Sequence, residues 1–274
     1  MSLGTFRGTV ASRLALFGRW PISAALMRPS LLTPVTSVPS ERLLDTALRA
    51  VEAARSVSLE ELTTRSRGRG PADPRPAGAA GQSPPRGRSA LARLRGREGL
   101  HSPPRRPGIW PGEHYRLLSA LVALLAPKTV LELGTATGMS ALTMKSALPE
   151  DGKIVTFDVV PWNRYPGALL RAEDFTDGRL EQRLEDLSTP AGWQANAELL
   201  RSADFILVDA AHTGVQERGF VRGFEQIGLA NGPIVMFDDI RLWGMLSFWQ
   251  ELERPKLDLT SFGHWSGTGL VDYA

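Results

Sequence analysis

The sequence predicts an α/β fold in which a mostly parallel sheet is covered by helices on both faces and carries one antiparallel strand at its C-terminal end. From Ile109 onward, short apolar segments of strand type alternate with segments of helical periodicity, which is typical of a parallel sheet with crossover helices. The strand predicted at residues 129–133 runs through a glycine turn directly into a helix. The last two strands have no helix between them, so one of them must run antiparallel to its neighbour.

The elements of this region follow one another in a regular order. Strands are short runs of aliphatic and β-branched residues, as in KIVTFD and FILVD, and helices are longer segments whose apolar residues recur three or four positions apart. We expect strands at residues 129–133, 153–158, 179–185, 205–209, 233–238, 257–262 and 270–273. We expect helices at residues 113–125, 139–148, 191–201, 216–227 and 242–252.

Residues 1–63 are expected to form a basic, helical N-terminal region. Residues 1–40 carry four arginines and no acidic residue, mixed with leucine and aromatic side chains. Transit peptides, membrane-surface helices and helices that dock on the same protein or on a second subunit share this composition, so a homo-oligomer stays open. A helix is expected from Ser40 to Leu62, with Ser40 as its N-cap.

Residues 64–107 differ in composition from the rest of the chain. They consist largely of proline, glycine and arginine and offer almost nothing to bury, so we expect a disordered insertion in front of a C-terminal domain at residues 108–274. The segment holds 11 arginines and two acidic residues, a charge of +9, whereas the whole chain carries +3. The remainder therefore carries about −6, which argues against a nucleic-acid partner of the folded domain. An RNA-binding arginine-glycine tail is the alternative explanation of the insertion.

Overall composition narrows the class of protein. The chain has 274 residues, of which 42% are apolar, and this is enough for a substantial core. It contains no cysteine, which excludes disulfides, cysteine-ligated zinc and thiol nucleophiles. No segment approaches the roughly 18 apolar residues that a membrane-spanning helix needs. These features fit a cytoplasmic enzyme, with peripheral membrane contact through residues 1–40 as a further expectation.

The segment TVLELGTATGMSAL, at residues 129–142, predicts a cofactor-binding loop. Gly134 and Gly138 let the backbone turn sharply and let a ligand approach without a β-carbon in the way. The helix that follows points its free N–H groups at the turn. A dinucleotide fingerprint would need glycine where this chain has Ala136, so the spacing favours another nucleotide-type cofactor. A tight turn without any ligand is the alternative.

Acidic residues stand at the carboxyl ends of five predicted strands, which is where open α/β sheets bind their ligands. They are Glu132, Asp158, the pair Glu185 and Asp186, Asp209, and the pair Asp238 and Asp239. Asp158 follows the glycine turn by about twenty residues, a place suited to the hydroxyls of a ribose. Asp186 could meet an adenine amino group.

Asp209, Asp238 and Asp239 come from two strands that we expect to be adjacent. Three clustered carboxylates repel one another unless a cation neutralises them. An all-oxygen set suits Mg²⁺, with Ca²⁺ or Mn²⁺ as alternatives. Helix capping at the strand exits is the competing explanation for Asp209 and Asp238.

The succession of ELGTATG, an aspartate after the second strand, DAAH and FDD resembles class I S-adenosylmethionine-dependent methyltransferases. Within them it resembles the divalent-metal-dependent O-methyltransferases typified by the catechol and caffeoyl-coenzyme A enzymes. The resemblance covers residues 109–273 and implies a Rossmann-like sheet. It implies that S-adenosylmethionine is held by Glu132, Gly134, Thr135, Ala136, Gly138, Asp158 and Asp186, and the metal by Asp209, Asp238 and Asp239.

Two positions depart from the family pattern. The second ligand from the fifth strand is often asparagine in the family, and this chain has Asp239 there. The family places a lysine, as general base, three residues after the first metal aspartate, and this chain has His212. Histidine can serve as a base because its ordinary pKa is near ~6.5. A capping or structural histidine is the alternative.

The resemblance implies methyl transfer from S-adenosylmethionine to a hydroxyl of a small molecule, with Mg²⁺ assistance and His212 as base. Vicinal diols and catechols are the acceptors that such a metal would chelate. Candidates for the pocket wall are Trp110, His114, Tyr115, Trp162, Tyr165, Trp243, His264 and Trp265. The alternatives are a metal-independent class I methyltransferase that acts on nitrogen or RNA, and a non-catalytic cofactor-binding scaffold.

Overall fold

The computed structural model describes residues 37–56, 113–263 and 265–274. All of them belong to one compact unit, which extends from Thr36 to Ala274. The expectations for the basic N-terminus and for the proline-, glycine- and arginine-rich segment lie outside the described residues, as do Trp110 and His264. Within the described part, no helix has the length and apolar character needed to cross a membrane.

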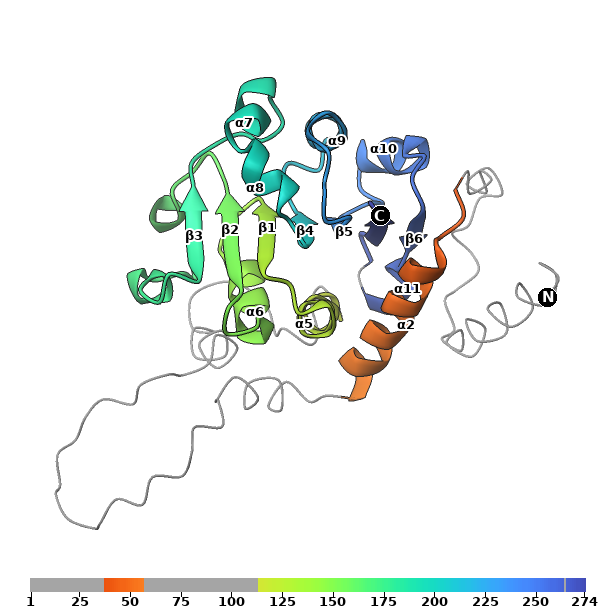
Figure 1. Ribbon diagram of the computed structural model, residues 1–274, viewed down its shortest axis with the longest axis horizontal. Helices are drawn as coiled ribbons and strands as arrows, with labels where there is room; N and C mark the ends of the chain where they lie inside the picture. Colours follow the sequence, from red (N-terminus) through yellow and green to blue (C-terminus); the bar gives the residue numbers. More distant parts are fainter. Residues whose placement is uncertain (1–36, 57–112, 264) are drawn as a thin grey trace, which may run out of the picture. The chain divides into compact units, whose positions relative to one another are not determined.

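A seven-stranded sheet forms the centre of the fold (Figure 1), with the strand order β3-β2-β1-β4-β5-β7-β6. The strands are β1 Thr129–Leu133, β2 Lys153–Phe157, β3 Leu180–Arg183, β4 Phe205–Val208, β5 Ile234–Asp238, β6 Lys256–Asp258 and β7 Thr268–Asp272. The strands β1 to β5 pair in parallel, and β7 is antiparallel to both of its neighbours, β5 and β6. This is the Rossmann-like arrangement that the sequence predicts.

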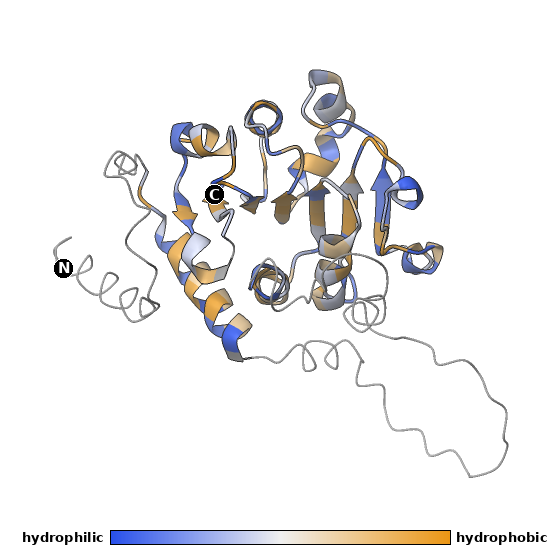
Figure 2. Ribbon diagram, turned by 180° about the vertical axis from the view of Figure 1, so that it is seen from behind, coloured by the Kyte–Doolittle hydropathy of each residue, from blue (hydrophilic) through white to orange (hydrophobic). Residues whose placement is uncertain are grey.

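Two groups of helices cover the sheet (Figure 1). The α-helices are α2 Glu41–Ser56, α5 His114–Leu125, α6 Met139–Ala147, α7 Pro190–Ala195, α8 Ala197–Arg201, α9 Val215–Ile227, α10 Met245–Glu251 and α11 Thr260–Gly263. Helix α5 packs against both α2 and α6, and α7, α8 and α10 pack around α9. Alternate residues of the central strands, such as Leu131 and Leu133 of β1, join the apolar side chains of α7 to α10 in one core. Figure 2 shows that the central strands are hydrophobic, whereas the edge strand β3 is hydrophilic.

Three local predictions are wrong. The helix expected at residues 191–201 is interrupted at Asn196, whose side chain bonds to Arg183 instead of facing solvent. The strand expected at residues 257–262 ends at Asp258, because the Asp258 carboxylate accepts hydrogen bonds from the N–H and hydroxyl of Thr260 and starts α11. The helix expected from residue 242 begins at Met245, and residues 239–244 form a loop.

The N-terminal helix α2 is tied to the C-terminal strand β7. Ser40 caps the helix as predicted, since its Oγ accepts a hydrogen bond of 3.1 Å from the N–H of Leu43. The Ser40 hydroxyl also donates to Asp272, and the Arg42 guanidinium lies 2.9 Å from the same buried carboxylate. The apolar face of α2 packs on α5. These contacts join the first described segment to the sheet.

Candidate functional site

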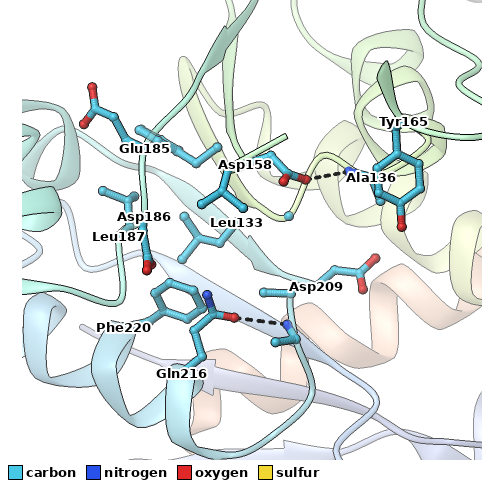
Figure 3. Close-up of a pocket in the computed structure, with 15 residues that line it drawn as sticks. Leu133, Ala136, Asp158, Tyr165, Glu185, Asp186, Leu187, Asp209, Gln216 and Phe220 are labelled. Carbon is cyan, nitrogen blue, oxygen red and sulfur yellow. Dashed lines mark hydrogen bonds between the residues drawn. The ribbon is translucent and has the colours of Figure 1, made fainter. Parts of the chain in front are cut away.

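A cavity of about 250 Å³ lies at the carboxyl ends of β1 to β4 (Figure 3). It is lined by Leu133, Gly134, Ala136, Phe157, Asp158, Val159, Tyr165, Glu185, Asp186, Leu187, Asp209, Ala210, Ala211, Gln216 and Phe220. The location follows from the topology, because the loops after parallel strands gather at one edge of the sheet. The mixture of apolar walls and a few carboxylates is typical of a small-molecule site.

The glycine turn forms one wall of this cavity and touches the end of β4. Gly134 has a φ of +107°, and a β-carbon on it would lie 1.8 Å from the carbonyl oxygen of Asp209. Its N–H donates to the carbonyl of Phe157 over 2.8 Å. Glycine is therefore required at this position by both the backbone angle and the lack of space.

Asp158 binds the backbone of the glycine turn. Its Oδ2 accepts hydrogen bonds of 3.0 Å from the N–H groups of Thr135 and Ala136, and its Oδ1 accepts one of 2.9 Å from Val160 (Figure 3 shows the bond to Ala136). A carboxylate offers about four acceptor positions, so three are used by the backbone. Among the described residues, the fourth position, at Oδ1, accepts no hydrogen bond, and Asp158 lines the cavity.

Four of the seven predicted cofactor contacts line the cavity, and three lie behind its wall. Gly134, Ala136, Asp158 and Asp186 belong to the first set. The other three are Glu132, Thr135 and Gly138. Thr135 is buried and bonds through its hydroxyl to Thr156 over 2.7 Å. A β-carbon on Gly138 would collide with the side chain of Leu170, so this glycine lets the segment between β2 and β3 pack against the turn.

Glu132 is buried completely beneath the turn. Burial raises its pKa from 4.5 to about 8, and the charges of Asp209 and Asp158 act in the same direction, while the hydroxyls of Ser140 and Thr156 oppose the rise. The side chain therefore carries a proton at neutral pH. It can act on a ligand only through neighbouring residues.

Several lining residues were not among the predicted cofactor contacts. The sequence indicated Glu185, because it ends a predicted strand, and Tyr165, which was among the aromatic candidates. It gave no indication of Gln216 and Phe220. Both lie on α9, which approaches the cavity only through the packing of the sheet. Gln216 accepts a hydrogen bond of 3.2 Å from the N–H of Ala211 and so fixes the loop after β4 (Figure 3).

Next to the cavity, the structure brings His212 together with two of the predicted metal ligands. The Nε2 of His212 lies 3.4 Å from Asp209 Oδ1 and 3.6 Å from Asp239 Oδ2. Asp209 also lines the cavity, so it belongs to both groups. Asp238 is buried, and its pKa is raised by that burial and by the charges of Asp209 and Asp239. The three aspartates and the histidine therefore form one electrostatic cluster.

The loops that carry this cluster are held against each other through their backbones. A β-carbon on Gly214 would lie 2.3 Å from the carbonyl oxygen of Gly244, which belongs to the loop after β5. The buried Glu217 accepts hydrogen bonds from the N–H groups of His212 and Gly214, over 2.9 and 2.7 Å. His212 and Asp239 both have left-handed φ angles, of 55° and 57°. Such strained residues concentrate at functional sites.

The environment of His212 favours the protonated imidazole. Burial by itself lowers its pKa, but the hydrogen bond to Asp209 and the charges of Asp209, Asp239 and Glu217 raise the pKa more. The result is a pKa above the ordinary value of 6.5. The other ring nitrogen, Nδ1, is buried and has no hydrogen-bond partner among the described residues.

The chemistry of the donor set fits a hard divalent cation, because it consists of carboxylate oxygens that repel one another. In the described part of the chain, however, no three acidic or histidine side chains are arranged as a ready metal site. The His212 ring stands between Asp209 and Asp239. Coordination would therefore require these side chains to rotate.

The remaining aromatic candidates divide between the interior and the surface. His114 is buried, with its Nδ1 3.5 Å from Asp238 Oδ1 and 3.3 Å from Thr268 Oγ1. Trp162 stacks on Phe175. Trp243 and Trp265 are exposed, and their loops are joined by a hydrogen bond of 2.8 Å from Arg241 N–H to the Ser266 carbonyl.

A model of the O-methyltransferase family matches residues 91–247 of the chain. Among curated proteins, the chain is 34% identical over 108 residues to tricin synthase 2 of Oryza sativa subsp. japonica, covering 36% of this chain and 35% of the relative. It is 29% identical over 153 residues to caffeoyl-CoA O-methyltransferase 1 of Zea mays, covering 50% and 57%. It is 37% identical over 103 residues to catechol O-methyltransferase domain-containing protein 1 of Mus musculus, covering 36% and 37%. The chain thus spans from about a third to less than two thirds of the length of these relatives.

Solved structures of methyltransferases also resemble the chain. An SAH-bound methyltransferase from Podospora anserina is 19% identical, with 68% of this chain and 86% of that chain covered and a TM-score of 0.47. An O-methyltransferase from Bacillus cereus in complex with SAH is 17% identical, with 68% and 90% covered and a TM-score of 0.44.

Proposed function

Because the chain belongs to the O-methyltransferase family, we propose that it transfers a methyl group from S-adenosylmethionine to a hydroxyl group of a small molecule. The family match confirms the resemblance predicted from the glycine turn and the strand-end acids. The observation that carries the proposed activity is the position of Asp209. This residue lines the cavity at the ends of β1 to β4 and also contacts His212 in the neighbouring acidic cluster.

Three features of the cavity support a nucleoside as its ligand. Gly134 lets the ligand approach the backbone, and Asp158 keeps one acceptor position for a ribose hydroxyl. Asp186 also lines the cavity and offers a carboxylate to the adenine base of the nucleoside. When bound, S-adenosylmethionine supplies a methyl group on a positively charged sulfonium, which an oxygen nucleophile can attack.

His212 is the residue that we assign as general base. A neutral hydroxyl is a poor nucleophile, and its proton has to leave as the oxygen attacks. The Nε2 of His212 would accept this proton, and the carboxylates of Asp209 and Asp239, within 3.6 Å, would stabilise the resulting imidazolium. Glu217 holds the loop so that the ring stays beside them.

We further propose that Asp209, Asp238 and Asp239 hold Mg²⁺ during the reaction. The cation would lower the pKa of a hydroxyl bound to it and would favour acceptors with two neighbouring oxygens. The all-oxygen donor set and the mutual repulsion of the carboxylates support this assignment.

A metal-independent O-methyltransferase is the second candidate. The position of His212 between Asp209 and Asp239 favours it, because the imidazolium formed when His212 takes the proton would neutralise part of the carboxylate charge without a cation. The two candidates share the cofactor site and the base, and they differ in the effect of a chelator.

The test is to incubate the full chain with labelled S-adenosylmethionine and a panel of catechols and vicinal diols, with and without EDTA. If labelled catechol or diol forms without EDTA, does not form with EDTA, and forms again when Mg²⁺ is added, the result supports the metal-assisted reaction. Turnover at full rate in EDTA supports the second candidate. Binding of S-adenosylhomocysteine without turnover of any hydroxyl acceptor would contradict both and support the scaffold alternative. In a parallel incubation with amines or RNA, labelling of these acceptors instead of the hydroxyl compounds would support methylation of nitrogen or RNA.

A further inference from the structure

Two adjacent acidic residues, Glu185 and Asp186, line the same end of the cavity but point in different directions. In Figure 3 the carboxylate of Glu185 points away from the other labelled residues, whereas that of Asp186 points toward Phe220. Both residues follow the hydrophilic edge strand β3, so their position after this strand does not explain why their carboxylates point in different directions. The difference must come from what each carboxylate binds.

Glu185 is held by Asn196, the residue at the break between α7 and α8. The Asn196 amide donates to the Glu185 carboxylate and, over 2.8 Å, to the carbonyl of Gly192. Its Oδ1 accepts a hydrogen bond of 2.7 Å from the guanidinium of Arg183. Asn196 is 3% exposed, so its amide is fixed in a buried site with all of these bonds made.

The hydrogen bonds that hold Asn196 continue, through Arg183, along the edge of the sheet. The Nε of Arg183 lies 2.8 Å from Glu181, and Glu181 also binds Lys153. Arg183 is thus fixed at both ends and can keep the orientation of the Asn196 amide. An amide that points its NH₂ group at Glu185 holds this carboxylate outside the cavity.

Asp186 is fixed differently and keeps an oxygen for the cavity. Its Oδ1 accepts hydrogen bonds from the N–H and hydroxyl of Ser188, over 2.8 and 2.6 Å. No described residue donates a hydrogen bond to the second oxygen, Oδ2, and Asp186 lines the cavity. An ionised carboxylate can accept hydrogen bonds but cannot donate one.

We propose that Asn196 is a positioning residue that holds Glu185 out of the base-binding end of the cavity, so that Asp186 alone contacts the base. The site then prefers a base that presents an amino group to one that presents a carbonyl oxygen, which a carboxylate repels. The proposal rests on the proposed function, because it assumes that a nucleoside occupies the cavity.

The test compares the binding of S-adenosylhomocysteine with that of S-inosylhomocysteine, its 6-oxo analogue, by calorimetry on the full chain. The wild-type protein should bind the amino compound about tenfold more tightly or better, because a hydrogen bond to a charged group is at stake. Asp186→Asn should bring the two affinities close together, since an amide can donate to a carbonyl oxygen. Glu185→Gln should change neither affinity by more than about twofold.

The role of Asn196 itself is measured with a double-mutant cycle. Asn196→Ala should lower the affinity for S-adenosylhomocysteine by ~5-fold or more, because the freed Glu185 side chain can enter the base-binding end. Adding Glu185→Ala should restore it to the level of Glu185→Ala alone. A purely structural role of Asn196 predicts no such rescue. Arg183→Met, which leaves the helix break intact, should show a smaller loss in the same direction.

Each outcome supports or contradicts the proposal. If the wild-type protein binds neither ligand, the proposed function fails and this inference fails with it. If the wild-type protein binds S-adenosylhomocysteine but Asn196→Ala and Arg183→Met leave affinity and base preference unchanged, the inference alone is wrong. The same holds if Glu185→Ala fails to rescue Asn196→Ala, or if Glu185→Gln alone abolishes the base preference.

Discussion

The carbonyl oxygen of Asp209 occupies the space that a β-carbon on Gly134 would need, at a distance of only 1.8 Å from that position. This close approach joins the glycine turn after β1 to the loop after β4. Asp209 also carries the carboxylate that lies 3.4 Å from His212. The glycine is therefore what allows the cavity and the acidic cluster to share a wall.

Gly134→Ala should abolish binding of S-adenosylhomocysteine and lower the melting temperature. The added β-carbon meets backbone atoms that cannot move without shifting β4, and the φ of +107° is itself unfavourable for alanine. Gly178→Ala is the matched control, because Gly178 also has a positive φ, +72°, but a β-carbon there meets nothing within 4 Å. Calorimetry and thermal unfolding measure both effects. Equal loss of stability in the two variants would contradict the importance of the Asp209 contact.

Asp158→Ala should weaken binding of S-adenosylhomocysteine by about tenfold or more, since a charge-assisted hydrogen bond and the shape of the turn are lost together. The same variant should lower stability, because three backbone N–H groups lose their acceptor. Asp177→Ala is the control: Asp177 also accepts a backbone hydrogen bond and pairs with Lys145, but it does not line the cavity. Unchanged affinity in Asp158→Ala would remove Asp158 from the site.

Glu132 should make the protein less stable as the pH rises. Its pKa is about 8 in the folded protein and near the ordinary 4.5 in the unfolded chain. Between these values the folded state binds more protons than the unfolded state, so the free energy of unfolding falls with rising pH. The stabilisation is complete below about pH 4.5 and lost as the pH passes 8.

Glu132→Gln should therefore flatten the fall of melting temperature between pH 5 and pH 8, as measured by circular dichroism at a series of pH values. Glu181→Gln is the control with the opposite sign, because Lys153 and Arg183 hold the pKa of Glu181 below its usual range. Glu181→Gln should therefore change the dependence of the melting temperature on pH in the acidic range. A wild-type profile that stays flat up to pH 8 would contradict the raised pKa of Glu132.

His212→Ala should lower the rate of methyl transfer and leave a residual activity that rises with pH, because solvent can then take the proton. In the wild-type protein the rate should rise with pH through the pKa of His212, which lies above its ordinary value. Asp238→Asn is the comparison for the metal: it should abolish turnover while leaving the affinity for S-adenosylhomocysteine within about twofold, since Asp238 does not line the cavity. Identical pH–rate profiles for the wild type and His212→Ala would show that the histidine is not the base.

The sequence by itself determined the order of the strands along the chain, the glycine turn and the acids at the carboxyl ends of five strands. These features depend on local properties: apolar runs of strand length, the need for glycine at Gly134, and the change from apolar to acidic residues where a strand leaves the core. The general rule that ligands bind at the carboxyl ends of parallel strands then predicted where the cavity lies. The resemblance to the O-methyltransferases then predicted S-adenosylmethionine as the cofactor and a hydroxyl as the acceptor group.

Only the tertiary structure decided what each acid can do. Glu132, Asp158 and Asp186 read alike in the sequence, yet the first is buried beneath the turn, the second binds the backbone, and the third faces the cavity. Asn196, whose segment the periodicity predicts as one helix, instead breaks it and binds Glu185. Exposure, hydrogen bonding and charge are set by groups that lie far apart in the chain, and their approach depends on the packing of loops such as those at Gly134 and Asp209. Local periodicity carries no record of these distances.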